Sequence, residues 1–235
     1  MRKELSVLML AARSSIYKIC MVLLGMVVLQ IVFLRRGWQG AVSLERIIEV
    51  SYIEKIFYIA FLGIYFILIW TESKKGSQFE YTLRRLGISR KRVFFLWAGY
   101  NSCCLFILFA VQIFISICIG RVYLEWADPM DRSAQSLFLA FWRNDFLHSL
   151  LPLAEVSRWI RNGLMILAMG LVTAFFGGEE LWNRKMPLVW IGVLFLLVFS
   201  DSAGSWRSDL IKGVLFLGII LFILAGVIRR GWCEE

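Results

Sequence analysis

The chain has 235 residues, of which 60% are hydrophobic and only 18% are charged, and its formal net charge is +9. A soluble domain carries about 25% charged residues, so this composition excludes an ordinary soluble domain and indicates a polytopic membrane protein. Backbone groups in lipid must be hydrogen-bonded internally, so we expect an all-α fold in a single transmembrane domain, residues 1–235. The basic residues flank the apolar runs and therefore do not indicate nucleic-acid binding.

The first residues predict a helix on the membrane surface. In residues 1–13 the basic side chains surround an apolar helical face formed by Leu5, Leu8, Met9 and Ala12, which is typical of an amphipathic helix on the cytoplasmic side. Apolar runs follow, and each is expected to cross the membrane. The expected spans are about 16–34, 52–70, 93–120, 159–176, 187–200 and 210–228.

One loop and one span stand out in this part of the chain. Residues 37–51 are expected to form a mixed-charge loop on the outer side. Residues 93–120 contain no charged side chain, and this length exceeds the ~20 residues needed to cross. We therefore expect the third span to be tilted or to project outward.

Residues 137–153 are apolar but should not cross the membrane. Arg143 and Asp145 lie in the middle of this run. About nine Leu and Phe contribute roughly −4 to −5 kcal/mol to insertion, whereas one Arg and one Asp cost roughly 5–7 kcal/mol. We expect an outer amphipathic or re-entrant helix within residues 134–153, ending at Pro152, with His148 as an interfacial residue beside Asp145.

The most basic part of the chain is the basic segment, residues 71–92, which lies between the second and third spans. It carries seven Lys or Arg against two Glu, and this excess predicts that the segment and both termini are cytoplasmic. Ser77 and Glu80 form a Ser-x-x-Glu capping box, so a helix should begin near Gln78. A narrow apolar stripe follows on this helix at i, i+4 and i+7: Phe79, Leu83 and Leu86.

The end of this short helix is also predicted. Gly87 can adopt the left-handed conformation that ends a helix, and Arg84 and Arg85 lie in the last turn, where the helix dipole favours cations. Ser89 can cap the next helix, which enters the membrane. A basic amphipathic helix of this kind is most often a topological anchor on anionic lipid.

A resemblance to a known protein family predicts the function more specifically. Glu72, Gly76-Ser77 and residues 83–92 (LRRLGISRKR) resemble the cytoplasmic coupling segment of type-2 ABC transporter permeases. The family pattern is an acidic residue, Gly-Thr, a few apolar positions and then Leu-x-x-Leu-Pro/Gly-Ile-Ser-Arg. Here Ser77 replaces Thr, and Gly87 stands where Pro is common.

The resemblance implies a six-span permease subunit of an exporter in the cell membrane, with an N-terminal elbow helix. It implies as partners a second permease, identical or related, and separate ATP-binding cassette ATPase subunits. It also implies a set of ATPase-coupling residues: Phe79, Glu80, Leu83, Arg84, Arg85, Leu86, Gly87 and Arg90.

This chain is expected to be a transport subunit rather than an enzyme. It has no Gly-Lys pair and hence no phosphate-binding loop, so ATP and Mg²⁺ would be bound by the partner ATPase and no cofactor by this chain. The five cysteines lack metal-ligand spacing. Four polar residues inside the spans favour interhelical hydrogen bonds over a transport path: Gln30, Asn101, Ser102 and Gln112.

Two alternatives remain from the sequence. The chain could be a membrane-anchored scaffold whose basic segment binds only lipid. It could also be an intramembrane protease, because Glu179-Glu180-Leu-Trp-Asn-Arg184 matches a Glu-Glu-x-x-x-Arg motif whose paired carboxylates activate water. Such a protease needs further histidines on other helices, and the chain contains one histidine, His148.

Overall fold

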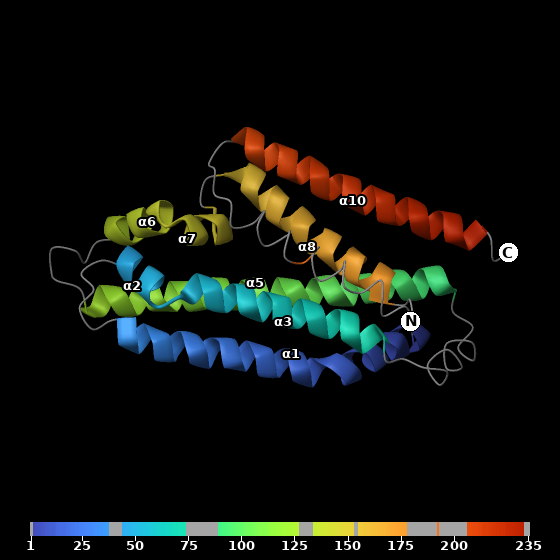
Figure 1. The fold of residues 1–235 in the computed structure, drawn as a ribbon, viewed down its shortest axis with the longest axis horizontal. Helices are drawn as coiled ribbons and strands as arrows, with labels where there is room; N and C mark the ends of the chain where they lie inside the picture. The colour runs from blue at the N-terminus through green and yellow to red at the C-terminus, as the bar shows by residue number, and fades with distance from the viewer. Residues whose placement is uncertain are drawn as a thin grey trace.

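The computed structural model describes residues 2–37, 44–73, 89–126, 134–152, 155–177, 192 and 206–232. Within these ranges all regular secondary structure is α-helical, which confirms the expected all-α fold for this part of the chain (Figure 1). The helices are α1 (Arg2–Gly37), α2 (Leu44–Val50), α3 (Ile53–Ser73), α5 (Arg90–Trp126), α6 (Ala134–Arg143), α7 (Asp145–Leu150), α8 (Val156–Gly177) and α10 (Trp206–Trp232).

Four of the described helices are long and apolar enough to cross a membrane, over Ala12–Gly37, Ile53–Trp70, Lys91–Glu125 and Trp206–Arg229. They correspond to the expected spans at 16–34, 52–70, 93–120 and 210–228. The expected span at 159–176 lies in α8, a 22-residue helix that is not among the four. The expected span at 187–200 lies outside the described residues, except for Gly192.

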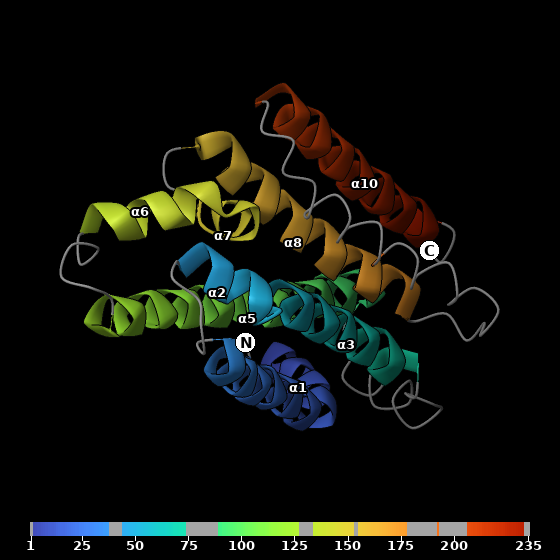
Figure 2. The ribbon, with the colours of Figure 1, turned by 60° about the vertical axis from the view of Figure 1, so that its left-hand side comes forward.

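The long helices form one elongated bundle, and α2, α6 and α7 lie together at one end of it (Figures 1 and 2). α5 packs against α1, α3 and α8, whereas the main neighbour of α10 in the described residues is α8. The other end of the bundle holds the beginning of α1, the end of α3, the beginning of α5 and the end of α10 (Figure 1).

α8 and α10 run parallel to each other. Arg161 near the start of α8 contacts Asp209 near the start of α10. A Cβ on Gly226, near the end of α10, would lie 3.3 Å from the ring of Phe175, near the end of α8. Gly177 and Trp206 therefore lie at opposite ends of the bundle, as the ribbons in both views agree (Figures 1 and 2).

The closest helix contact is between α5 and α8. A Cβ added to Gly170 would lie 2.8 Å from the backbone nitrogen of Ser102 and 2.9 Å from the carbonyl oxygen of Ala98. Beside this contact Asn101 Nδ2 donates a hydrogen bond of 2.9 Å to Thr173 Oγ1. Small residues such as glycine allow helix backbones to approach this closely in membranes, and a hydrogen bond between the two helices further stabilises their contact.

The core between α1, α3 and α5 combines aromatic packing with a buried amide pair. Phe57 and Phe109 pack edge to face, with ring centroids 5.3 Å apart. Gln30 Nε2 donates a hydrogen bond of 2.8 Å to Gln112 Oε1. The expectation that polar residues inside the spans form interhelical hydrogen bonds is confirmed for Gln30, Gln112 and Asn101.

Two expectations about the first third of the chain were wrong. Residues 1–13 do not form a separate elbow helix, because α1 continues without interruption from Arg2 to Gly37 and no Gly or Pro interrupts it before Gly25. Residues 37–51 are not simply a loop, since they contain α2. Three apolar residues of α2 at i, i+3 and i+4 are buried and explain this helix: Leu44, Ile47 and Ile48.

The expected single helix over 137–153 is in fact two short helices, α6 and α7, which have 10 and 6 residues. Asn144 separates them, because its extended backbone ends α6 and its side-chain Oδ1 accepts a hydrogen bond of 3.0 Å from the Leu147 nitrogen at the start of α7. Each helix is too short to cross about 30 Å of hydrocarbon. His148 is buried within the protein, with 7% of its surface exposed.

Candidate functional site

The ATPase-coupling residues predicted from the sequence lie almost entirely outside the described part of the chain. This applies to Phe79, Glu80, Leu83, Arg84, Arg85, Leu86 and Gly87. Arg90 is the first residue of α5, and the placement of its side chain also lies outside the description. The flanking helices are described: α3 ends at Ser73, and α5 begins directly after Ser89.

The expected cap at Ser89 has the right backbone position. The carbonyl oxygen of Ser89 accepts a hydrogen bond of 3.2 Å from the nitrogen of Val93, which is the first intrahelical bond that an N-cap residue accepts. The basic segment therefore connects directly to the 37-residue helix α5.

The most strongly organised polar site in the described residues is a buried ionic cluster at the opposite end of the bundle. Asp209 Oδ1 lies 2.5 Å from Arg161 Nη1, and Asp209 Oδ2 lies 3.3 Å from Arg158 Nε. The exposed fractions of Arg158, Arg161 and Asp209 are only 4%, 3% and 5%. Glu155 forms an ion pair with Arg158, so two cations face two anions.

Helix geometry explains why these side chains meet. Arg158 and Arg161 are three residues apart, so they project from the same face of α8. Asp209 lies in the first turn of α10, where the helix dipole stabilises an acidic side chain. Because α8 and α10 are parallel, their first turns are adjacent, and the carboxylate of Asp209 lies between the two guanidinium groups.

A second set of contacts connects the ionic cluster to α7. Asn162 Oδ1 accepts hydrogen bonds of 3.1 and 3.3 Å from Arg161, and Asn162 Nδ2 donates one of 2.8 Å to the carbonyl oxygen of Ser149. His148 Nε2 lies 3.9 Å from Glu155 Oε2. The cluster therefore joins α8 to α10 by buried charge-assisted contacts, and the hydrogen bond from Asn162 to Ser149 connects it to α7.

The electrostatics of His148 follow from its place beside this cluster. Its ring packs against Trp142, with centroids 4.7 Å apart. Burial lowers the pKa of His148, and the nearby guanidinium of Arg158 lowers it further, while Glu155 and Asp145 raise it. The net effect favours the neutral imidazole.

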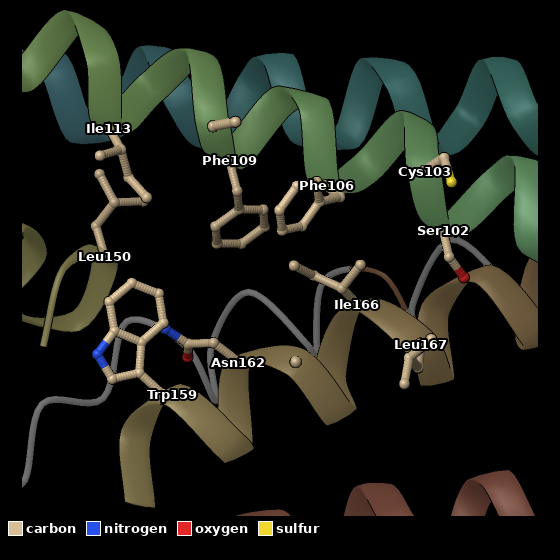
Figure 3. Close-up of a pocket in the computed structure, with 12 residues that line it drawn as sticks. Ser102, Cys103, Phe106, Phe109, Ile113, Leu150, Trp159, Asn162, Ile166 and Leu167 are labelled. Carbon is tan, nitrogen blue, oxygen red and sulfur yellow. The ribbon is translucent and has the colours of Figure 1, made fainter. Parts of the chain in front are cut away.

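An apolar cavity of about 530 Å³ lies between α5, α7 and α8. Figure 3 shows side chains of α5 and α8 facing each other across it, with Leu150 of α7 near one end. Its lining is nearly all hydrocarbon and includes Phe106, Phe109, Ile113, Trp159, Ile166 and Leu167. The α5 residues of the lining lie in the middle of the candidate span Lys91–Glu125, at the depth expected for lipid tails.

Sequence reasoning missed the ionic cluster, although its signal was present. Arg158 and Arg161 occur one turn apart at the start of an apolar run, and Asp209 is an acid at the start of the last run. Neither these arginines nor this aspartate has a role in the interpretation of the sequence given above.

The motif Glu179–Glu180 lies outside the described residues. Among the residues that the structure describes, no three His, Cys, Asp or Glu side chains are grouped so that they could hold a metal ion.

Comparison with known proteins found no family model, no curated protein and no solved structure that matches the chain.

Proposed function

We propose that this chain is the membrane-spanning permease subunit of an ATP-binding cassette exporter, coupled through residues 77–88 to a separate ATPase subunit. The observation that carries the proposal is the sequence of the basic segment, in which Glu72, Gly76-Ser77 and residues 83–92 resemble the coupling segment of type-2 permeases. The positions of the flanking helices support it, because the segment connects α3 to α5 and both contain a candidate membrane span.

The helix order also supports a six-span arrangement. α8 and α10 are parallel, so residues 178–205 connect opposite ends of the bundle. We assign the two further spans to α8 and to residues 187–200. Gly192, in the middle of the latter, is buried, and a Cβ there would lie 2.7 Å from the ring of Tyr65 on α3. Six crossings return both termini to the same side.

In the proposed mechanism the apolar stripe Phe79, Leu83 and Leu86 binds in a groove of the ATPase. Each large apolar side chain buried there contributes about 1.5–3 kcal/mol, and Arg84, Arg85 and Arg90 pair with acidic residues around the groove. ATP-driven closure of the ATPase subunits moves the short helix. The movement passes directly to α5, which reorients relative to its neighbours as a rigid body. A second permease, identical or related, completes the transporter.

Leu83→Asp tests this proposal. A tagged full-length chain would be expressed in its native cells and purified in mild detergent, and the amount of co-purified ATPase would be measured. The variant should lose the ATPase and ATP-driven transport, because a carboxylate cannot be buried in an apolar groove without a partner. Membrane insertion should be normal, since residue 83 lies outside the expected spans.

Gln78→Asp is the matched control, because it adds the same charge to the same predicted helix outside the apolar stripe. This variant should retain the ATPase. Neutralising Arg84 and Arg85 together should weaken the complex, and the difference from the native chain should shrink at high salt. If Leu83→Asp still purifies with stoichiometric ATPase and normal coupled activity, the segment is not a coupling helix.

A further inference from the structure

Two buried glutamine side chains face each other between α1 and α5, inside two candidate membrane spans. Gln30 Nε2 donates a hydrogen bond of 2.8 Å to Gln112 Oε1, and it also lies 3.5 Å from the carbonyl oxygen of Ile53 on α3. Neither glutamine has any exposed surface. The pair is therefore removed from solvent on all sides, at a level where three helices meet.

The hydrogen bonds present do not satisfy these two amides. Each amide has two N–H donors and one carbonyl acceptor. Within the described part of the chain, Gln30 Oε1 and Gln112 Nε2 have no hydrogen-bond partner. Exchanging oxygen and nitrogen in either amide would only move the deficit to other atoms, because one bond between the amides cannot use four donors and two acceptors. The deficit therefore does not depend on how the amides are oriented.

Two buried serine hydroxyl groups near the glutamines also lack hydrogen-bond partners among the described residues. Ser116 lies one turn after Gln112 on the same face of α5, and its Oγ has no partner among the described residues. Ser51 is fully buried directly after α2, and its Oγ also has no hydrogen-bond partner among the described residues. Buried polar groups are normally paired with protein or with ordered water, because an unpaired one loses its hydration without compensation.

We propose that ordered water occupies this site and bridges Gln30 Oε1, Gln112 Nε2 and Ser116 Oγ. Three polar groups from two helices match the two to four hydrogen bonds that a buried water makes. All three side chains are neutral, so the site suits a small neutral hydrogen-bonding molecule rather than an ion. The proposal does not depend on the ATPase-coupling function.

The site has a short connection to the end of the bundle that holds α2. Gln30 lies seven residues before Gly37, which corresponds to about 10 Å along the helix. Ser51 Oγ lies against Gly37, and the neighbouring Tyr52 is exposed. The site is therefore closer to this end of the bundle, measured along α1, than to the end that holds Arg2.

Met26 provides a direct probe of this water. It lies one turn before Gln30 on the same face of α1, and its side chain is 2% exposed. Hydroxyl radicals produced from bound water by brief X-ray exposure oxidise a methionine sulfur only where water is close. Met165 and Met169 of α8 are equally buried and serve as internal references in the same sample. The experiment uses the full chain in lipid nanodiscs, with oxidation rates read by mass spectrometry.

We expect Met26 to be oxidised several-fold faster than Met165 and Met169. Gln30→Leu combined with Gln112→Leu should lower the Met26 rate to that of the two references. Ser116→Ala removes one partner of the water with little change of volume, so its Met26 rate should lie between those of the native chain and the double variant. It replaces the double variant in the test if that variant does not fold. Asn101→Leu is the control, because it removes a buried amide of α5 whose bond to Thr173 lies outside the site. It should leave the Met26 rate unchanged.

Two outcomes would overturn the inference. One is a Met26 rate in the native chain no faster than that of Met165. The other is rapid oxidation of Met26 that persists in the variant without the glutamines, since water would then reach Met26 independently of this site.

Discussion

Replacing Asp209 by Asn should loosen the attachment of α10 to α8. The carboxylate of Asp209 contacts both Arg158 and Arg161, and all three side chains are at least 95% buried. Hydrogen bonds to charged groups contribute about 1.5–3 kcal/mol each, so two of them amount to roughly 3–6 kcal/mol. This agrees with the roughly 3–5 kcal/mol lost when one partner of a buried ion pair is removed. Arg158 retains Glu155 as a partner, so the loss should fall mainly on Arg161.

The free energy of unfolding would be measured in mixed micelles for the native chain and for Asp209→Asn. Asp145→Asn is the matched control, because it makes the same change at an exposed acidic residue of α7 and should cost less than about 1 kcal/mol. A cysteine pair at Leu164 and Gly213, which lie against each other between α8 and α10, would report the helix contact by its rate of disulfide formation. A loss below about 1 kcal/mol with an unchanged cross-linking rate would refute the assignment of Asp209 as the anchor of α10.

Three further predictions follow from other parts of the chain. Gly170→Ala should destabilise the fold by about 1–3 kcal/mol through overpacking, whereas Gly218→Ala, where a Cβ meets nothing within 4 Å, should be neutral or slightly stabilising in the same unfolding assay. The pKa of His148 is lowered from 6.5 by burial, so its contribution to stability should be complete above pH 6.5 and decline as the pH falls below it. His148→Gln should abolish this decline in pH-dependent unfolding. A cysteine at Gln78 should react with a membrane-impermeant reagent only from the cytoplasm and one at Met130 only from outside, and the reverse pattern would contradict the proposed topology.

The long helices were predictable because lipid leaves the backbone few solutions. The apolar runs predicted the positions of α3, α5, α8 and α10. Most of the predicted boundaries lie within a few residues of the observed ones. α2 was missed because the charges of residues 37–51 dominated their interpretation, although Leu44, Ile47 and Ile48 carry a helical period. The break at Asn144 was also missed, since it depends on a capping hydrogen bond rather than on hydrophobicity.

The ionic cluster was harder to predict than the helices. Asp209 and Arg158 are 51 residues apart, and only the parallel packing of α8 and α10 brings them together. In contrast, the polar residues inside the spans could be assigned to interhelical hydrogen bonds as a class, because polar groups in lipid need partners. Their actual partners, such as Gln30 with Gln112, required the helix packing. The ATPase-coupling residues stay a prediction from the sequence.

The sequence separation within the ionic cluster has a consequence for biosynthesis. Arg158 and Arg161 leave the ribosome before Asp209 exists, and 48 residues separate Arg161 from it. At about 5–20 residues per second this interval lasts roughly 2–10 s. During that time Arg158 has Glu155 as an ion-pair partner, whereas Arg161 lacks its ion pair with Asp209. An unpaired arginine is costly within a bilayer, so α8 should complete its insertion only when α10 arrives, and a chain truncated before Asp209 should be a substrate for membrane quality control.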